Sequence, residues 1–194
     1  MINKKKIKFW RIKILAKLIL SRLPFNYRSW AKFGIFRHGA MDDFSYAWSV
    51  LKKHASELKI EKNWKALEMG PGDSVLSSLL APALGSKGLI LVDSGNFAHK
   101  DMSLYKKQIE NFKKKYPALE LPFISFEKDL DKMLSYVNGN YFYNGLQSLK
   151  MIKSSSLNLI FSQAVLEHVR RNEFEETMEQ CFRLLKPSGI MSHV

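Results

Sequence analysis

The chain has 194 residues, of which 46% are hydrophobic, and this length suffices for one domain with a substantial core. Its single cysteine, Cys181, excludes an internal disulfide and a metal site built from cysteines alone, so nothing points to an oxidising compartment. A formal net charge of +13 fits a protein that binds nucleic acid or an anionic membrane, so the distribution of the charge has to be considered.

The basic residues are concentrated at the N-terminus. Residues 1–41 hold 11 lysines and arginines and no acid, whereas residues 42–194 hold 20 basic and 18 acidic residues. We therefore divide the chain into a basic helical arm with its linker, residues 1–41, and a domain, residues 42–194. Lysines interrupt the apolar stretch 12–23, which is also shorter than the roughly 20 apolar residues that span a bilayer. The sequence therefore predicts a cytoplasmic protein.

The arm has two interpretations. Apolar residues alternate with lysines within residues 1–23, so a helix here could lie peripherally on the anionic inner surface of a membrane. The apolar residues do not form one stripe, however, and packing on the domain or on a partner is equally compatible. Binding to nucleic acid is less favoured, because apolar side chains gain little on a phosphate backbone.

Helical and extended patterns alternate from residue 42 onward. Apolar residues recur at spacings of three and four between Phe44 and Leu58, with Asp42 or Asp43 as the N-cap. A strand over 65–69, a glycine turn at 70–72 and a helical pattern over 75–84 follow. A second strand over 89–92 precedes a helix over 105–116 that Pro117 ends.

The alternation continues to the end of the chain. We expect a helix around 127–137, a third strand over 140–143 and a fourth over 157–161. Asn172 with Glu175 resembles a capping box at the start of a helix that ends at Lys186, and a fifth strand is expected from Ile190. This order predicts the α/β class, with a doubly wound, mostly parallel sheet.

Two polar motifs follow the first two strands. Gly70 and Gly72, after Glu68, allow a sharp turn that approaches a ligand at the carboxyl ends of the strands, although an ordinary strand-to-helix turn looks the same. The dinucleotide pattern G-x-G-x-x-G is absent, because Val75 follows Ser74. Asp93 ends the second strand, where a carboxylate can accept both hydroxyls of a ribose or cap the loop.

Four motifs occur together in one order: E-M-G-P-G, V-D-S, N-L-I-F-S-Q-A-V-L-E-H-V and R-L-L-K-P-S-G-I. This order resembles the class I S-adenosylmethionine-dependent methyltransferases, in particular the group with a leucine-glutamate-histidine run after the fourth strand. The resemblance covers roughly residues 64–194. It implies a Rossmann-like methyltransferase fold with S-adenosylmethionine as the cofactor.

The resemblance also implies cofactor-binding residues. The methionine end of the cofactor would lie at Glu68, Gly70, Pro71 and Gly72, and its ribose at Asp93 and Ser94. Ser162 and Gln163 would lie beneath the sulfonium. The adenine would lie beside Asn144, Gly145 and Leu146.

The chain departs from the family pattern at three places. The third strand lacks the acid that often binds the adenine amino group, and Asn144 or Gln147 would have to replace it. Ser74 replaces the third glycine of the first motif. The family sheet normally has seven strands, whereas this chain ends inside its fifth at Val194, so we expect a chain truncated at its C-terminus.

Methyl transfer from a sulfonium is an in-line displacement, for which the protein chiefly holds donor and acceptor in position. A hydroxyl acceptor also needs a base, and His168 is the candidate, although a histidine that only packs its loop fits the same position. Metal-binding patterns such as H-E-x-x-H and C-x-x-C are absent from the sequence, so no metal is expected.

The predicted function is methylation, most simply O-methylation, of a small-molecule, glycan or lipid-linked acceptor. Methylation of RNA is a second possibility, because the basic arm could neutralise phosphates. The third possibility is a binding protein with a decayed methyltransferase fold. It is suggested by the altered third-strand motif and by the missing C-terminal strands. Binding of the cofactor separates this last possibility from the first two.

Overall fold

The structure is a computed structural model that describes residues 41–127 and 129–194. The predictions for the basic arm, residues 1–41, lie outside these residues except at Met41, which is buried in the core. None of the helices within the described ranges is both long and apolar enough to cross a membrane.

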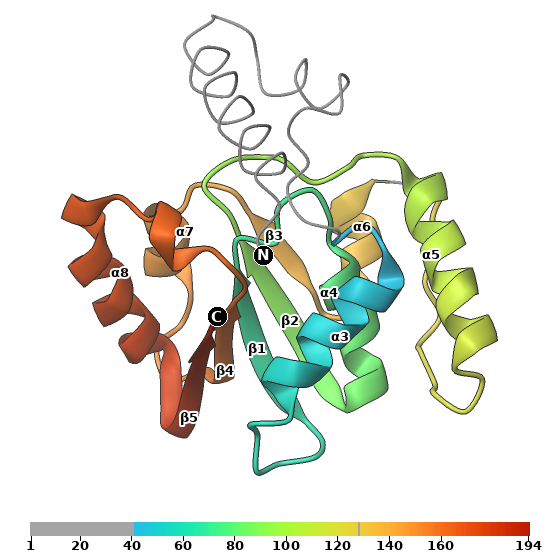
Figure 1. Cartoon of the computed structure of the whole chain (residues 1–194), viewed down its shortest axis with the longest axis horizontal. Helices are drawn as coiled ribbons and strands as arrows, with labels where there is room; N and C mark the ends of the chain where they lie inside the picture. The colour runs from blue at the N-terminus through green and yellow to red at the C-terminus, as the bar shows by residue number, and fades with distance from the viewer. Residues whose placement is uncertain (1–40, 128) are drawn as a thin grey trace, which may run out of the picture. The chain divides into compact units, whose positions relative to one another are not determined.

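One sheet forms the centre of the described domain, and its strands all run parallel (Figure 1). Side by side, the strands are β3 (Asn140–Phe142), β2 (Ser86–Val92), β1 (Trp64–Met69), β4 (Leu157–Ser162) and β5 (Leu185–His193). The chain moves outward from β1 to β3 on one side and then returns to β4 on the other. The prediction of a doubly wound parallel sheet is therefore confirmed, and the switch between β1 and β4 marks the place where such sheets bind ligands.

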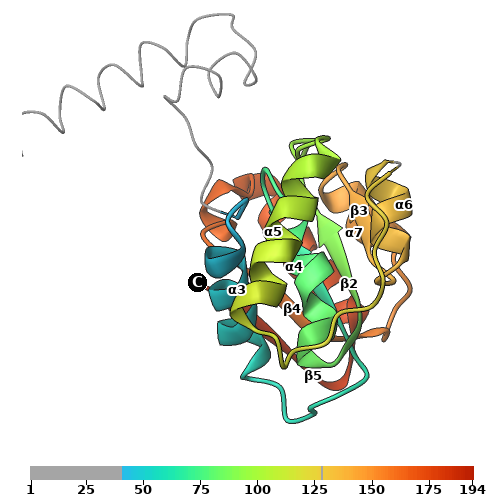
Figure 2. The same ribbon diagram turned by 90° about the vertical axis from the view of Figure 1, so that its right-hand side faces the viewer.

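Helices cover both faces of this sheet (Figures 1 and 2). The first face is covered by α3 (Phe44–Ala55), α4 (Leu76–Leu80), the 3-10 helix η1 (Ala81–Leu84) and α5 (Met102–Lys115), and α6 (Leu130–Ser135) packs into the same cluster. The second face is covered by α7 (Leu146–Met151) and α8 (Arg171–Leu184), with the 3-10 helix η2 (Leu166–His168) between β4 and α8.

Successive side chains along each strand point to opposite faces of the sheet, so the domain has one apolar core on each face. Ala66 and Phe161 point into the cluster beneath α3, α4 and α5, whereas Leu67, Met69 and Ile160 point into the cluster beneath α7 and α8. Strands buried on both faces have nearly continuous apolar sequences, as β1, β2 and β4 do. The same alternation decides which residues at the strand ends can reach a ligand on either side.

The first helix begins where the sequence predicts. Asp43 is its N-cap, and its Oδ1 accepts hydrogen bonds from the backbone N–H groups of Ser45 (2.8 Å) and Tyr46 (3.1 Å). The predicted helix before Pro117 is α5, for which Asp101 is the N-cap. All strands except β5 lie within about three residues of their predicted bounds.

Three expectations near the C-terminus need correction. Helix α8 begins at Arg171 with Arg170 as its N-cap, so Asn172 lies inside the helix and forms no capping box with Glu175. Strand β5 begins at Leu185, because Lys186–Gly189, expected as a turn, forms an irregularity in its pairing with β4. The sequence analysis missed α7, since six residues are too few to show a helical period.

Candidate cofactor site

The turn after β1 needs glycine at two positions. Gly70 and Gly72 both have φ of +67°, in the left-handed region that side chains disfavour. A Cβ on Gly70 would lie 2.5 Å from Cγ2 of Val165, so the loop after β4 packs directly against this backbone. The Gly70 N–H donates to the carbonyl of Val92 (2.8 Å), which joins the turn to the end of β2. The turn is therefore fixed between the end of β2 and the loop after β4.

Asp93 connects this turn with the second strand. Its Oδ2 accepts a hydrogen bond from the Gly72 N–H (3.0 Å), and its Oδ1 accepts one from the Ser94 N–H (2.7 Å). Burial raises the pKa of the carboxyl group, and these hydrogen bonds oppose the shift. The structure thus brings Asp93, Gly72 and Ser94 together, as expected for a ribose site, and the carboxylate remains at the edge of a cavity.

The loop after β3 completes one side of the site. Gly145 has φ of +50°, and its N–H donates to the Asp93 carbonyl (2.8 Å). The Asn144 N–H donates to Oγ of Ser148 in the first turn of α7 (3.0 Å). Asn144, Gly145 and Leu146 therefore lie beside Asp93, where the resemblance expects the adenine.

A cavity of about 640 Å³ lies at these strand ends, within the usual size range of ligand pockets. The predicted site residues that line it are Gly70, Asp93, Ser94, Asn144, Gly145, Leu146 and His168. The predicted residues that do not line it are Glu68, Pro71, Gly72, Ser162 and Gln163. The structure therefore assembles the expected ribose and adenine residues around one cavity and leaves much of the expected methionine and sulfonium side outside it.

Glu68 faces the other side of the sheet. Its side chain is 2% exposed, and its Oε2 accepts a hydrogen bond from the hydroxyl of Ser77 in α4. Burial raises the pKa of this carboxyl to about 7, and the nearby charge of Asp93 adds to the shift. The next residue, Met69, points the opposite way and lines the cavity. Glu68 supports the turn from beneath rather than lining the cavity.

Ser162 is held at the end of β4. It lies in register with Met69 of β1 on one side and with His193 of β5 on the other, and its Oγ lies 2.8 Å from Nδ1 of His193. Another histidine, His54 of α3, stacks on Phe161, and its Nδ1 lies 2.7 Å from Oγ of Ser192. Burial lowers the pKa of both histidines, so both imidazoles are neutral at pH 7.

His168 lies in η2 at the rim of the cavity. Its side chain is 76% exposed, and its Nε2 is 3.6 Å from Oε1 of Glu167. The described residues place no buried partner on this imidazole. The side chain is therefore free to turn toward a bound molecule.

The sequence analysis missed the far wall of the cavity. Arg170, Glu173 and Thr177 line it from the first turns of α8, together with Val165 of the preceding loop. The spacing of 170, 173 and 177 places these residues on one side of a helix once the helix is known to begin at Arg171. Arg170 and Glu173 form an ion pair (3.3 Å) at the rim.

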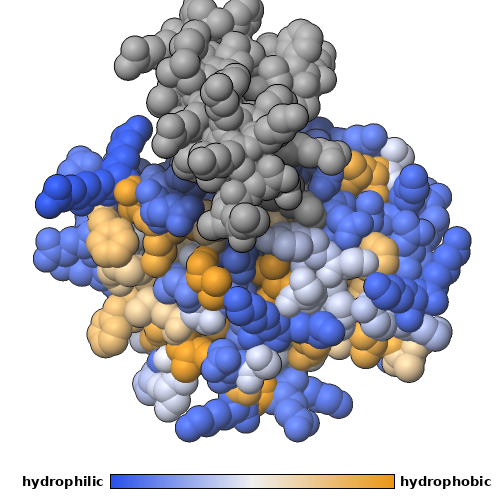
Figure 3. Space-filling view, viewed as in Figure 1, coloured by the Kyte–Doolittle hydropathy of each residue, from blue (hydrophilic) through white to orange (hydrophobic). Residues whose placement is uncertain are grey.

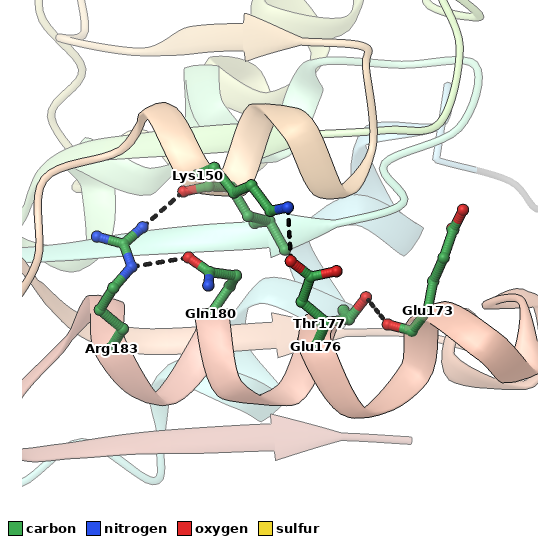
Figure 4. A network of polar contacts seen from close by, with 7 residues as sticks. Lys150, Glu173, Glu176, Thr177, Gln180 and Arg183 are labelled. Atoms are coloured by element: carbon green, nitrogen blue, oxygen red, sulfur yellow. Dashed lines mark hydrogen bonds and ion pairs between the residues drawn. The ribbon is translucent and has the colours of Figure 1, made fainter.

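Polar contacts join this wall to α7 (Figure 4). The guanidinium of Arg183 donates to the carbonyls of Leu149 (2.9 Å) and Ile152 (3.0 Å), which lie at the C-terminal end of α7. Lys150 and Glu176 form an ion pair (2.5 Å) between the two helices. A helix of six residues is not stable by itself, so α8 holds α7, and with it the Asn144–Leu146 loop, in place.

Comparison with known proteins identifies the family. Residues 67–192 match the family model described as a methyltransferase domain. The chain therefore belongs to this family, and the predicted class of protein is confirmed. Among the curated proteins, no sequence matches the chain significantly.

Three solved structures illustrate the likeness of the fold. Phosphoethanolamine N-methyltransferase 2 of Haemonchus contortus, in complex with S-adenosylhomocysteine, has 14% identity and a TM-score of 0.43, over 76% of this chain and 27% of its own. Coclaurine N-methyltransferase has 11% identity and a TM-score of 0.44, over 76% and 34%. The CurJ carbon methyltransferase has 17% identity and a TM-score of 0.41, over 77% and 33%. The chain thus spans about a third or less of these proteins.

No group of three or more metal-binding side chains occurs in the described part of the domain.

Proposed function

We propose that the domain binds S-adenosylmethionine and transfers the methyl group to a small-molecule, glycan or lipid-linked acceptor. The observation that carries this proposal is the hydrogen-bonded contact of Asp93 with the Gly70–Gly72 turn at the edge of a cavity of ligand size. The residues at this edge fit the cofactor, because the carboxylate of Asp93 and the backbone of Gly70 face the same cavity.

Each side of the cavity has a separate task in this proposal. Asp93 accepts the ribose hydroxyls, and the Asn144–Leu146 loop flanks the adenine. The cofactor supplies an activated methyl group. The chain's own residues orient the donor and exclude water from the side of α7 and α8.

We further propose a hydroxyl group as the acceptor, with His168 as the residue that takes its proton. His168 lines the same cavity as Asp93, and its exposed imidazole has a ring nitrogen that can accept a proton from a bound hydroxyl. The solved structures above include enzymes named as N- and C-methyltransferases, so the acceptor atom is a matter for experiment.

Asp93→Ala should weaken binding of S-adenosylhomocysteine at least about tenfold, roughly 1.4 kcal/mol, because both ribose hydroxyls lose their acceptor. Titration calorimetry measures the dissociation constant. Asp101→Ala is the matched control, since Asp101 is an exposed N-cap of α5 that does not line the cavity, and its affinity should equal that of the wild type. Absence of any heat or thermal shift with the wild type would instead favour a binding protein with a decayed fold.

For the basic arm, we propose peripheral binding to an anionic membrane surface on the cytoplasmic side. The 11 basic residues of the arm and the apolar residues among them support the proposal. Burial of the apolar side chains in the membrane interface would contribute about 25 cal/mol per Å² of buried apolar area. Deleting residues 1–23 should reduce co-sedimentation with anionic vesicles while leaving neutral vesicles unbound. Tight binding of RNA together with indifference to anionic vesicles would point to the RNA methyltransferase instead.

A further inference from the structure

The domain carries a concentrated basic surface that the methyltransferase site does not use. Helices α3 and α5 together hold seven lysines and one glutamate. Residues 42–194 as a whole hold 20 basic and 18 acidic residues, so the rest of the domain has a net negative charge. The positive charge is therefore localised on two neighbouring helices.

Four of these lysines lie on one side of α5. Helix α5 buries Tyr105, Ile109 and Phe112. At 100° per residue, its exposed lysines at 106, 107, 113 and 114 fall within roughly a third of the helix circumference, away from this buried side. Figure 3 shows a mainly hydrophilic surface over α5, at the right of the view.

Two further lysines lie over aromatic rings at the contact between α3 and α5. Lys115 donates a hydrogen bond to Oγ of Ser45 (3.4 Å), and its Nζ lies 5.6 Å from the ring centroids of both Phe44 and Tyr116. Nζ of Lys52 lies 5.7 Å from the ring centroid of Trp48, which packs against Tyr116. Lys52 and Lys115 therefore belong to the contact between the two helices, and we define the lysine face as the four exposed lysines on another side of α5, namely Lys106, Lys107, Lys113 and Lys114.

The lysine face carries an excess of positive charge. None of its four lysines forms an ion pair with an acid among the residues that the structure describes. Glu110 is the acid that α5 places among them. Exposed amines that repel one another favour an anionic surface as a counter-charge.

We propose that the lysine face binds the anionic phospholipid headgroups of a membrane. Two features favour headgroups over nucleic acid. The face contains lysines only, which attract phosphate as point charges and lack the planar fork with which arginine reads nucleic acids. The rings of Tyr105 and Phe112, which α5 carries on its other side, are fully buried, so they cannot stack on bases. Binding to a layer of anionic headgroups requires only the positive charge of the lysines.

The test compares two variants of the full chain that have the same net charge. The first changes Lys106, Lys107, Lys113 and Lys114 to glutamine. The control changes four exposed lysines outside the lysine face to glutamine, namely Lys59, Lys62, Lys65 and Lys87. Co-sedimentation with phosphatidylcholine vesicles, with and without phosphatidylserine, is measured at low and high salt, beside a filter-binding assay with a single-stranded RNA. Circular dichroism confirms that both variants are folded.

The α5 variant should bind phosphatidylserine vesicles at least about tenfold more weakly than the wild type, since each lysine near the surface contributes a factor on the order of five. The control variant should bind nearly as well as the wild type. Equal losses in both variants would show that only net charge counts, and no loss in the α5 variant would leave the arm as the sole contact. Each of these outcomes overturns the proposal, as does a loss confined to RNA binding. Binding of S-adenosylhomocysteine is independent of all of them.

Discussion

Gly70→Val should lower the affinity for S-adenosylhomocysteine by at least about 100-fold, roughly 2.7 kcal/mol. The backbone of Gly70 has φ of +67°, which a β-branched residue rarely adopts. In addition, a Cβ at this position would lie 2.5 Å and 2.8 Å from the two γ-carbons of Val165. Both effects displace the turn from the cavity, so the affinity measured by titration calorimetry should fall steeply.

Ser74→Ala is the control for this experiment. Ser74 is buried four residues later in the same loop, and its Oγ accepts a hydrogen bond from the Leu76 N–H (3.2 Å) at the start of α4. Losing this hydrogen bond costs about 1 kcal/mol of folding stability and should change the affinity little. If Ser74→Ala and Gly70→Val bound the ligand equally well, the cofactor would have to lie away from this turn.

A double variant separates the two causes. Gly70→Ala alone keeps both the unfavourable φ and the collision with Val165, whereas Gly70→Ala with Val165→Ala removes the collision and keeps the φ. We expect the double variant to recover part of the affinity that Gly70→Ala loses. Recovery to the wild-type affinity would assign the whole effect to the close approach of the two loops.

The sequence was most informative where a local requirement determines a residue. Positive φ at Gly70 and Gly72 and the position of Asp93 directly after β2 both leave a mark in the sequence, and so does the N-cap of α3. The order of strands and helices followed from the alternation of apolar patterns. These features depend on residues close together in the chain.

Features that depend on distant residues were not predictable. Arg183, more than 30 residues later in the chain, donates hydrogen bonds to the carbonyls at the end of α7, and nothing within 146–151 signals this contact. Side chains alternate between the two faces of the sheet, so the face to which Glu68 points depends on the register of β1. It also has to be known which face α4 covers, because Ser77 of α4 contacts Glu68. Arg170 and Glu173 required knowledge of where α8 begins, and the apparent capping box at Asn172 placed this start too late.

The buried carboxyl of Glu68 should make the stability of the domain depend on pH. Burial raises its pKa from 4.5 to about 7, so the folded state binds a proton more tightly than the unfolded state does. Between these values the folded state holds more protons, and the free energy of unfolding therefore decreases as the pH rises from about 4.5 to about 7. The decrease from this one group is on the order of 3 kcal/mol, and it is complete above pH 7.

Glu68→Gln should remove this dependence, because glutamine has nearly the same shape and stays neutral at every pH. Urea unfolding at a series of pH values should give equal stabilities for the two proteins near pH 4.5 and a variant that is more stable by up to about 3 kcal/mol at pH 7.5. His54 and His193 act in the opposite direction, since burial lowers their pKa and stability is lost as the pH falls below 6.5. They titrate in both proteins, so the difference between the two curves reports Glu68 alone. Parallel curves would mean that Glu68 is ionised throughout and that a cation or water compensates its charge.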